Sequence, residues 1–423
     1  MLEEIRAKNY LSFRDEMCLS FEATADTTAE SQLVVTMPDG KRLLRFAMIY
    51  GANASGKSNV LTALVFLNNF WFDKPANIDQ STGVIPFLFD VATPNEPTEF
   101  SLCFYANGIR YRYILRLSRR QVLEEKLSYY TSVRPTMLFH RIMEDERLQL
   151  FINPAVHKIS EAELQQLQMQ CLPNMSFFAA RGQINIDLPK IDAAREWMLN
   201  RVMDIVEPSI GMFDFAKTKM ETDTALTQYL LRMLKSSDFN ISSIQTERVP
   251  ASLSAELVQA IRNNQELTDA IKQNVLTNLN AKFEHEVCNN RGDEKYLLED
   301  KLESRGTRRM LGIESAIFYT HRYDAILSID ELESSLHPAL IEHVIYDFLL
   351  HKGQSQLLIT THYDFLLDLV NDLIRKDCVW FTEKGADGAS SLYSLVEFSG
   401  LNKLSSFQTA YRRGRFGATP KIN

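Results

Sequence analysis

A short glycine-bracketed stretch near the start of the chain has the residue types that hold phosphate. Residues 51–58 read GANASGKS, after the apolar run 46–50 and before the apolar segment 60–66. This order predicts a strand, a turn and a helix, so that backbone N–H groups of the turn converge on phosphate oxygens. Lys57 would reach the β- and γ-phosphates, and the Ser58 hydroxyl would hold Mg²⁺. An ordinary glycine turn before a helix is the alternative.

Two consecutive carboxylates far downstream favour the phosphate site. The apolar segment 325–329 predicts a buried strand that ends at Asp330 and Glu331. Asp330 would bind Mg²⁺ through water, and Glu331 would position and polarise the attacking water. The next apolar strand, 356–360, ends in a Thr-His pair, where His362 would hydrogen-bond transferred phosphate oxygens as a sensor.

A second anion site is predicted at the start of a later helix. Residues 303–307 read ESRGT, and Ser304, Gly306 and Thr307 would present backbone N–H groups to an anion. One nucleotide does not need two such helix ends from one chain. A second copy of the protein could therefore supply this one.

The elements around these motifs predict an interrupted α/β domain. Alternation along residues 1–50 and 85–130 indicates strands, including a hairpin that turns at Asn107-Gly108, although a β-layer without ligand contact remains the bland alternative. A segment with three- and four-residue apolar spacing follows and favours helix. The predicted divisions are 1–152 (first part of the α/β domain, with the phosphate loop), 153–295 (helical insertion), 296–400 (second part of the α/β domain) and 401–423 (basic tail).

Composition sets the broad class of the protein. The 423 residues are 45% hydrophobic and 24% charged, with a formal charge of -8, which argues against a wholly basic nucleic-acid wrapper. Five scattered cysteines without a CxxC pair fit a reducing cytoplasm and offer no zinc site. No apolar run is long enough to span a membrane, so we expect a cytoplasmic protein.

The combination of motifs resembles the ABC-type ATPases of chromosome maintenance and repair, the SMC, RecF and OLD-like group. Asn53 inside the phosphate loop is similar to the Asn of those proteins. Other details resemble bacterial abortive-infection or Rlo-type ATPases: NYLSF (9–13), the ESRGT stretch, DELESSLHP (330–338) and GRFG (414–417). The resemblance covers roughly 1–150 and 295–420, and implies an α/β ABC-type P-loop ATPase head, with a mixed sheet and an antiparallel β-layer, interrupted by a helical insertion.

This resemblance implies ATP and Mg²⁺ as ligands and two ATPs sandwiched in a homodimer or higher homo-oligomer. Glu331 and His362 would be catalytic, and Ser58 and Asp330 would hold the metal. The residues implied to contact the nucleotide are Gly51, Asn53, Ser55, Gly56, Lys57, Ser58 and Asn59 of one copy, with Ser304, Gly306 and Thr307 of another. Two positions depart from the family pattern. Ala54 replaces a glycine and should fit with a negative φ, and Arg305 replaces a glycine and would add charge beside the phosphate.

The resemblance implies three candidate functions. The leading hypothesis is the ATPase sensor of an anti-phage system, acting with a separately encoded TOPRIM-like nuclease or toxin. A RecF-like repair ATPase that binds DNA is one alternative, and an ATP-gated scaffold that restrains a toxin with little turnover is another. The basic end, residues 411–417, could be a frayed terminus, a folded cap or a contact to nucleic acid.

Overall fold

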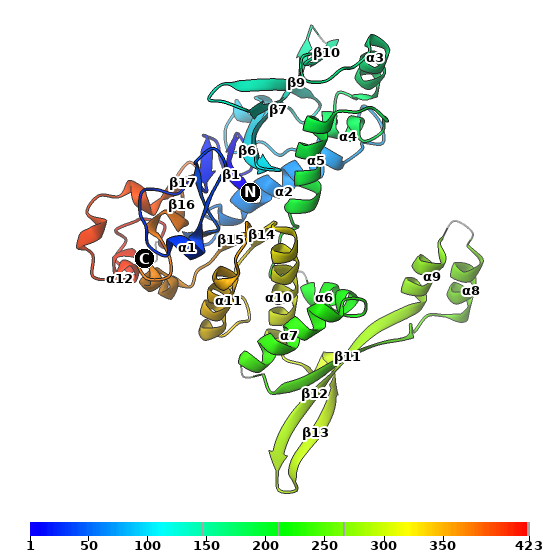
Figure 1. The fold of residues 1–423 in the computed structure, drawn as a ribbon, viewed down its shortest axis with the longest axis vertical. Coiled ribbons are helices and arrows are strands. Elements are labelled where there is room, and N and C mark those ends of the chain that lie inside the picture. Colours follow the sequence, from blue (N-terminus) through cyan, green and yellow to red (C-terminus); the bar gives the residue numbers. More distant parts are fainter. Residues whose placement is uncertain (146, 210, 238, 265–266, 421–423) are drawn as a thin grey trace. The chain divides into compact units, whose positions relative to one another are not determined.

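A five-stranded sheet carries the phosphate-loop sequence at the end of its middle strand (Figure 1). The structure is a computed structural model and describes residues 1–145, 147–209, 211–237, 239–264 and 267–420. The strand order is β14 (Ile326–Ile329), β15 (Gln356–Thr360), β5 (Phe46–Gly51), β16 (Val379–Lys384) and β17 (Ser390–Ser394). The first four strands are parallel, and β17 is antiparallel to β16. Because parallel strands end at a common edge, the segments after β5, β14 and β15 meet there.

Three helices connect these strands. The helix α2 (Lys57–Phe72) follows β5 and packs against β5 and β15. Helix α10 (Arg305–Tyr323) leads into β14, and α11 (Pro338–Leu350) leads into β15. Strand β5 is buried along its whole length, as an apolar strand with a neighbour on each side must be.

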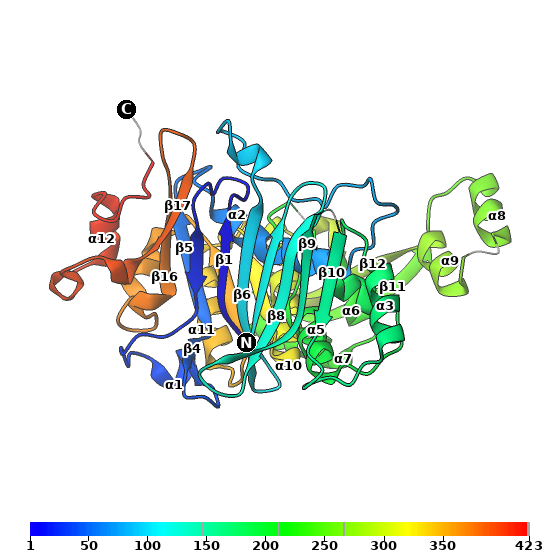
Figure 2. The same ribbon diagram turned by 90° about the horizontal axis from the view of Figure 1, so that it is seen from above.

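A seven-stranded antiparallel sheet forms a second layer (Figure 2). Its order is β10 (Arg147–Ile152), β9 (Pro135–Glu144), β8 (Val122–Tyr130), β7 (Ile109–Leu117), β6 (Thr98–Ala106), β1 (Leu2–Lys8) and β2 (Met17–Ser20). Rings from this sheet and its helices stack, with Trp71 3.8 Å from Phe178 and Trp197 4.1 Å from Phe104. The predicted fold class, a mixed sheet around the phosphate loop with an antiparallel β-layer, is confirmed.

The side chain of Gln356 connects the two sheets. Its Oε1 accepts a hydrogen bond of 2.6 Å from Leu2 N, and its Nε2 donates to the carbonyls of Leu2 and Leu44 at 2.9 and 3.0 Å. The amide is buried, so these bonds satisfy backbone groups that water cannot reach. The first strand of the chain is thereby tied to β15, the strand that ends at His362.

A buried ion pair anchors the loop that follows the β-layer. Glu125 and Arg141 are both fully buried, 3.3 Å apart, and Glu125 also accepts hydrogen bonds from Ser176 Oγ and Phe177 N. Arg141 donates to the carbonyl of Met175. Because each charge has a partner, the pair fixes the position of helix α4 (Phe177–Arg181) without leaving an uncompensated charge.

Smaller elements complete this part of the chain. The helices are α1 (Glu30–Leu33), α3 (Glu161–Gln170), α4 (Phe177–Arg181), α5 (Pro189–Arg201) and α12 (Phe407–Arg412). The remaining strands here are β3 (Val34–Thr36) and β4 (Arg42–Leu44). Short 3₁₀ turns lie at Thr93–Asn95, Asp300–Leu302, Asp364–Leu369, Lys376–Cys378, Leu395–Glu397 and Leu401–Lys403. All five cysteines are free thiols.

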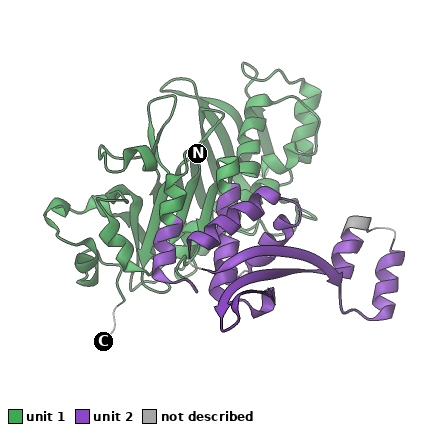
Figure 3. Ribbon diagram, turned by 60° about the horizontal axis from the view of Figure 1, so that its bottom comes forward, with its two compact units in different colours: residues 1–207, 320–333, 345–423 green, residues 208–319, 334–344 purple. Residues whose placement is uncertain are grey.

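The chain divides into two compact units, and the second contains most of the predicted helical insertion (Figure 3). The first unit comprises residues 1–207, 320–333 and 345–423, and the second 208–319 and 334–344. The elements confined to the second unit are α6 (Met212–Met220), α7 (Thr224–Ser236), β11 (Ile241–Pro250), α8 (Ala255–Asn263), α9 (Asp269–Leu276), β12 (Thr277–Asn289) and β13 (Gly292–Glu299). These boundaries differ from the predicted ones at 152/153 and 295/296.

The sequence predicted a helical insertion, but part of this segment forms β-strands. Strands β11, β12 and β13 form an antiparallel sheet, and residues 254–283 include α8, α9 and the start of β12. In β12, Ala281 and Phe283 are buried while Lys282 between them is not. This two-residue period belongs to a strand, and it overrides the looser helical spacing upstream.

The basic end of the chain is folded over residues 401–420. Phe416 is buried and stacks on Phe381 of β16 at 5.5 Å, and Tyr411 lies 5.5 Å from Tyr50 of β5. Arg412 donates two hydrogen bonds to the carboxylate of Asp364, at 2.6 and 3.0 Å. Of the three alternatives for this segment, these contacts exclude the frayed terminus and describe a cap.

Among the described residues, no helix combines the length and apolarity that crossing a bilayer requires.

A buried histidine predicts a loss of stability in acid. His321 of α10 stacks on Phe348 and His351 at 4.7 and 4.0 Å, and its Nδ1 lies 2.9 Å from Ser355 Oγ. Burial, together with His351 and Arg45, lowers the pKa of His321 to about 3. Below the ordinary pKa near 6.5, the unfolded chain binds a proton that the folded chain does not. We therefore expect the free energy of unfolding to fall by up to about 1.4 kcal/mol per pH unit between about pH 6.5 and pH 3.

Urea denaturation near pH 7.5 and near pH 5 measures this effect. The substitution His321→Phe should flatten the pH dependence, since it removes the group whose protonation is linked to unfolding. The exposed His337 offers a control, because His337→Phe should leave the dependence unchanged. A pH dependence that His321→Phe leaves intact would contradict the assignment.

Candidate nucleotide-binding site

The loop between β5 and α2 has the backbone of a phosphate cradle. Gly56 has a φ of 107°, and α2 begins at the next residue, so the N–H groups of its first turn are free of helical partners. A Cβ at Gly56 would lie 2.7 Å from Ser390 Oγ and 2.8 Å from Ser12 Oγ, so a side chain here would have to displace these hydroxyls and would be strained by the positive φ. A phosphate group could accept hydrogen bonds from these N–H groups at the N-terminus of the 16-residue helix α2.

The expectation for Ala54 is wrong. Its φ is +60°, not negative, which places an alanine in the left-handed region. The loop reverses between β5 and α2 within residues 52–56, and this path needs a positive φ at 54 as well as at Gly56. An alanine there costs about 1 kcal/mol relative to its preferred conformations.

Lys57 lies in the centre of the site. Its Nζ donates to the carbonyls of Gly51 and Ala52 at 3.0 and 3.2 Å and lies 3.0 Å from His362 Nε2. The side chain is only 6% exposed. Burial lowers the pKa of Lys57, while the carboxylates of Asp330 and its neighbours oppose the shift. A desolvated cation at this edge of the sheet is suited to an anion.

Ser58 and Asp330 meet although they are far apart in the sequence. Ser58 Oγ donates to Asp330 Oδ2 at 2.8 Å, and Thr360 Oγ1 donates to Asp330 Oδ1 at 2.5 Å. Hydroxyl and carboxylate oxygens are the hard ligands that Mg²⁺ prefers, with water and phosphate oxygens completing its shell. The donor set thus fits Mg²⁺. Within the described residues, no group of three or more His, Cys, Asp or Glu side chains could hold a metal ion. Bound Mg²⁺ would therefore take its other ligands from water and phosphate.

The carboxylates that follow β14 surround the histidine that follows β15. Glu331 has a φ of 46°, and its N–H donates to Thr360 Oγ1 at 2.9 Å. Glu333 Oε1 accepts from the backbone N–H of His362 at 2.5 Å. Burial and the Lys57 ammonium lower the pKa of His362, which favours a neutral imidazole that can accept from Lys57.

The remaining predicted residues of the loop have distinct positions. Asn53 is exposed, and Ser55 is buried with its Oγ hydrogen-bonded to Thr382 Oγ1 at 2.6 Å. Asn59 Nδ2 donates to Ser12 Oγ at 2.8 Å. Ser55 therefore faces the sheet rather than the loop surface, and its predicted nucleotide contact would use its backbone.

The second predicted anion site lies at the start of α10, in the second unit. Ser304 Oγ accepts from Thr307 N at 2.9 Å, which caps the helix. A Cβ on Gly306 would lie 3.0 Å from the carbonyl of Ser335, so this glycine permits a close backbone approach. Arg305 is exposed in the first turn.

Sequence reasoning missed several polar residues around the loop. Thr360 precedes the Thr-His pair and Glu333 belongs to the DELE run, so both were adjacent to recognised motifs. Ser12, Thr382 and Ser390 come from distant segments that only the fold brings to the phosphate loop. For these three, no spacing in the sequence provides a signal.

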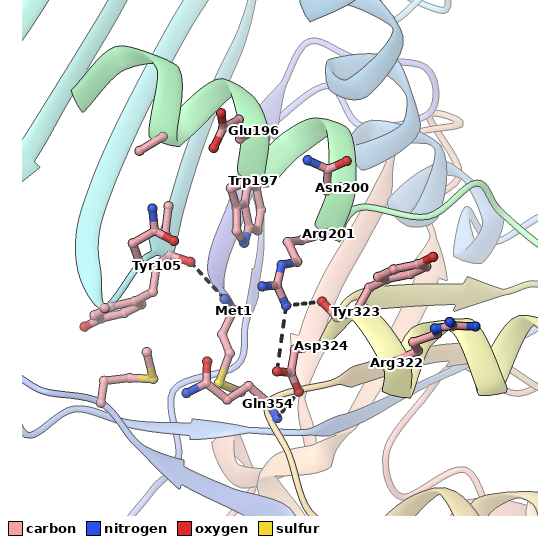
Figure 4. A pocket seen from close by; sticks show the side chains of 15 residues that line it. Met1, Tyr105, Glu196, Trp197, Asn200, Arg201, Arg322, Tyr323, Asp324 and Gln354 are labelled. Carbon is pink, nitrogen blue, oxygen red and sulfur yellow. Dashed lines mark hydrogen bonds and ion pairs between the residues drawn. The ribbon is translucent and has the colours of Figure 1, made fainter. Parts of the chain in front are cut away.

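A separate pocket of about 390 Å³ is lined by residues of α5 and the end of α10, and none of the predicted site residues lines it (Figure 4). There Arg201 donates to the carbonyl of Tyr323 and lies 3.7 Å from Asp324 Oδ2. Arg201 of this lining is thus paired within the chain.

Solved structures of similar fold are SMC heads. The SMC head domain from Thermotoga maritima is 12% identical, with 93% of this chain and 98% of that chain covered and a TM-score of 0.41. An SmcHead bound to the C-winged helix domain of ScpA is also 12% identical, with 95% of this chain and 99% of that chain covered and a TM-score of 0.43. The third structure is an Smc head domain with an extended coiled coil, bound to the C-terminal domain of ScpA derived from Pyrococcus furiosus. It is 12% identical, with 98% of each chain covered and a TM-score of 0.39. At these values, none of the three carries an argument about function.

No curated protein matches the chain. The model of one protein family, described as "AAA domain, putative AbiEii toxin, Type IV TA system", matches residues 46–168 and 172–368. The matched residues include the phosphate loop, the carboxylates after β14 and His362. This match confirms the resemblance to P-loop ATPases inferred from the motifs, and the chain belongs to this family of AAA-domain proteins.

Proposed function

We propose that this protein binds and hydrolyses MgATP at the phosphate loop. Lys57 contacts the β- and γ-phosphates, while Ser58 and Asp330 hold Mg²⁺, which would neutralise phosphate charge. Glu331 orients and polarises the attacking water, and neutral His362 hydrogen-bonds the γ-phosphate oxygens. The observation that carries this proposal is the convergence of three strand ends, in which Ser58 lies 2.8 Å from Asp330 and Lys57 lies 3.0 Å from His362.

The site is completed by a second copy of the chain. The capped start of α10, with Ser304, Gly306 and Thr307, belongs to the other compact unit, and we propose that it acts as a backbone anion site. In our proposal it closes over the γ-phosphate held by the partner's loop. Two ATPs then lie between two protomers in a two-fold arrangement, in which each interface residue is used twice.

ATP-dependent dimerisation is proposed to control an effector encoded separately, a nuclease or toxin, in defence against phage. The support is the family description, which names an abortive-infection toxin and a type IV toxin–antitoxin system. ATP turnover then serves as a timer for the dimer, because hydrolysis removes the phosphate that both protomers contact.

Mixing two inactive variants tests the composite site. Lys57→Ala disables the loop and Ser304→Arg blocks the start of α10, so each variant alone should show no ATP hydrolysis. When the two variants are mixed in equal amounts before ATP is added, half of the dimers contain one copy of each. Each such dimer has one intact site of its two, so phosphate release should return to about a quarter of the wild-type rate.

A chain that carries both substitutions is the matched control. Mixed with wild-type protein, it forms heterodimers without an intact site, so the activity per wild-type chain should fall. If the two single variants show no recovery when mixed, each site is not shared between two copies.

A further inference from the structure

The NYLSF motif at residues 9–13 has no part in the chemistry proposed above, yet its side chains are tightly bound. Asn9 is 2% exposed, and its Nδ2 donates to the carbonyls of Thr93 and Glu96 at 2.7 and 3.0 Å. Its Oδ1 accepts from Phe87 N at 3.0 Å. The motif therefore holds the irregular segment 85–97 in a fixed conformation.

The same motif also contacts the phosphate loop. Ser12 Oγ accepts from Asn59 Nδ2 at 2.8 Å, and the Ser12 carbonyl accepts from Ser390 N at 2.7 Å. Ser390 is 6% exposed, and its Oγ has no hydrogen-bond partner. Both hydroxyls lie within 3 Å of the position that a Cβ on Gly56 would occupy. An unsatisfied buried hydroxyl beside the loop is a group that a ligand can bond.

These contacts show which side of the loop faces the nucleoside. Lys57 and Ser58 reach Asp330 and His362, which lie at the γ-phosphate end of the site. In a phosphate loop the chain of phosphates runs from that end along the first helical turn, with the α-phosphate farthest from the catalytic carboxylates. Ser12 adjoins Asn59, the next residue of that turn, so the nucleoside leaves on the side of the NYLSF motif.

An exposed aromatic ring lies on this side. Phe89 is 70% exposed, and a Cβ on Gly388 would lie 2.8 Å from its Cδ2. Its ring meets Phe87 edge-on at 5.8 Å, and Lys384 Nζ lies 5.8 Å from its centroid. Gly388 belongs to the turn that leads into β17, and Ser390 is the first residue of that strand. Phe89 therefore lies beside the turn that precedes the hydroxyl facing Gly56.

We propose that Phe89 is the platform on which the base of the bound nucleotide stacks, with the NYLSF motif as the support that fixes both Phe89 and the phosphate loop. This inference rests on the proposed nucleotide site and adds its base-binding residue. Base stacking needs an aromatic ring that is accessible from solvent, and Phe89 is 70% exposed. Every purine and pyrimidine has a flat face that can stack on such a ring.

Calorimetric titration of the full chain with MgATP and with magnesium tripolyphosphate tests this platform. The substitution Phe89→Ala should weaken ATP binding about ten-fold or more while leaving tripolyphosphate binding unchanged, because only ATP has a base to stack. Phe89→Trp should keep ATP affinity. Its exposed indole should be quenched by ATP and not by tripolyphosphate, whereas the native Trp71, Trp197 and Trp380 are buried.

The control is Phe151→Ala, which removes a half-exposed ring from β10 and should not alter ATP affinity. The platform is overturned if Phe89→Ala binds ATP as the wild type does, or if ATP and tripolyphosphate lose affinity equally. Failure of the wild type to bind either compound overturns the phosphate site as well. Wild-type binding of both with no effect of Phe89→Ala overturns the platform alone.

Discussion

Replacing Glu331 by Gln should reduce ATP hydrolysis by about 100-fold or more and leave an ATP-bound dimer. Glu331 is the second residue after β14, and its backbone N–H donates to Thr360 Oγ1, which also donates to Asp330. Gln keeps this shape but cannot act as a base, and general base catalysis contributes about 10² to 10⁴ in rate. ATP binding and closure should persist because the groups proposed to hold the phosphates are unchanged.

Phosphate release measures the loss of turnover, and light scattering with and without ATP measures the mass of the complex. Glu161→Gln is a matched control, since Glu161 is an exposed carboxylate in the first turn of α3. A variant that remains monomeric with ATP bound would refute the sandwich. Normal turnover in Glu331→Gln would refute the role of this carboxylate.

Replacing Lys57 by Ala should weaken ATP binding by at least about 100-fold. The ammonium is nearly buried and paired with two carbonyls and an imidazole, so it is positioned before any ligand arrives. Charge-assisted hydrogen bonds to phosphate are worth about 1.5–3 kcal/mol each, and this cation can make more than one. Calorimetric titration with MgATP measures the loss.

The exposed Lys74, just beyond the end of the same helix, is the control, and Lys74→Ala should bind ATP normally. Thermal unfolding checks that both variants remain folded. ATP affinity that survives Lys57→Ala would show that the loop does not hold the phosphates.

The convergence of the site could be predicted because it follows from strand direction. Apolar runs ending in GANASGKS, in Asp330-Glu331 and in Thr361-His362 read as parallel strands, and such strands bring their C-terminal ends together. Residues adjacent in space then need no adjacency in sequence. The family match extends this interpretation to an AAA-domain protein.

The parts that could not be predicted depend on long-range packing or on local balance. Ser12 and Ser390 reach Gly56 only because two segments from opposite ends of the chain pack against it. The positive φ of Ala54 contradicts the usual preference of alanine, so composition gives no sign of it. In β12, polar residues on the exposed face hide the two-residue period of Ala281 and Phe283.

The strand order has a consequence for biosynthesis. Strand β5 pairs only with β15 and β16, which begin at Gln356 and Val379, so its partners leave the ribosome more than 300 residues later. At a synthesis rate of about 5–20 residues per second, this apolar strand remains unpaired for roughly 15–60 s. During that interval FAMIY is an unpaired edge, and the phosphate loop has no strand neighbours to hold it. A truncated chain that stops before β15 therefore contains the phosphate-loop sequence without the sheet that makes it a site.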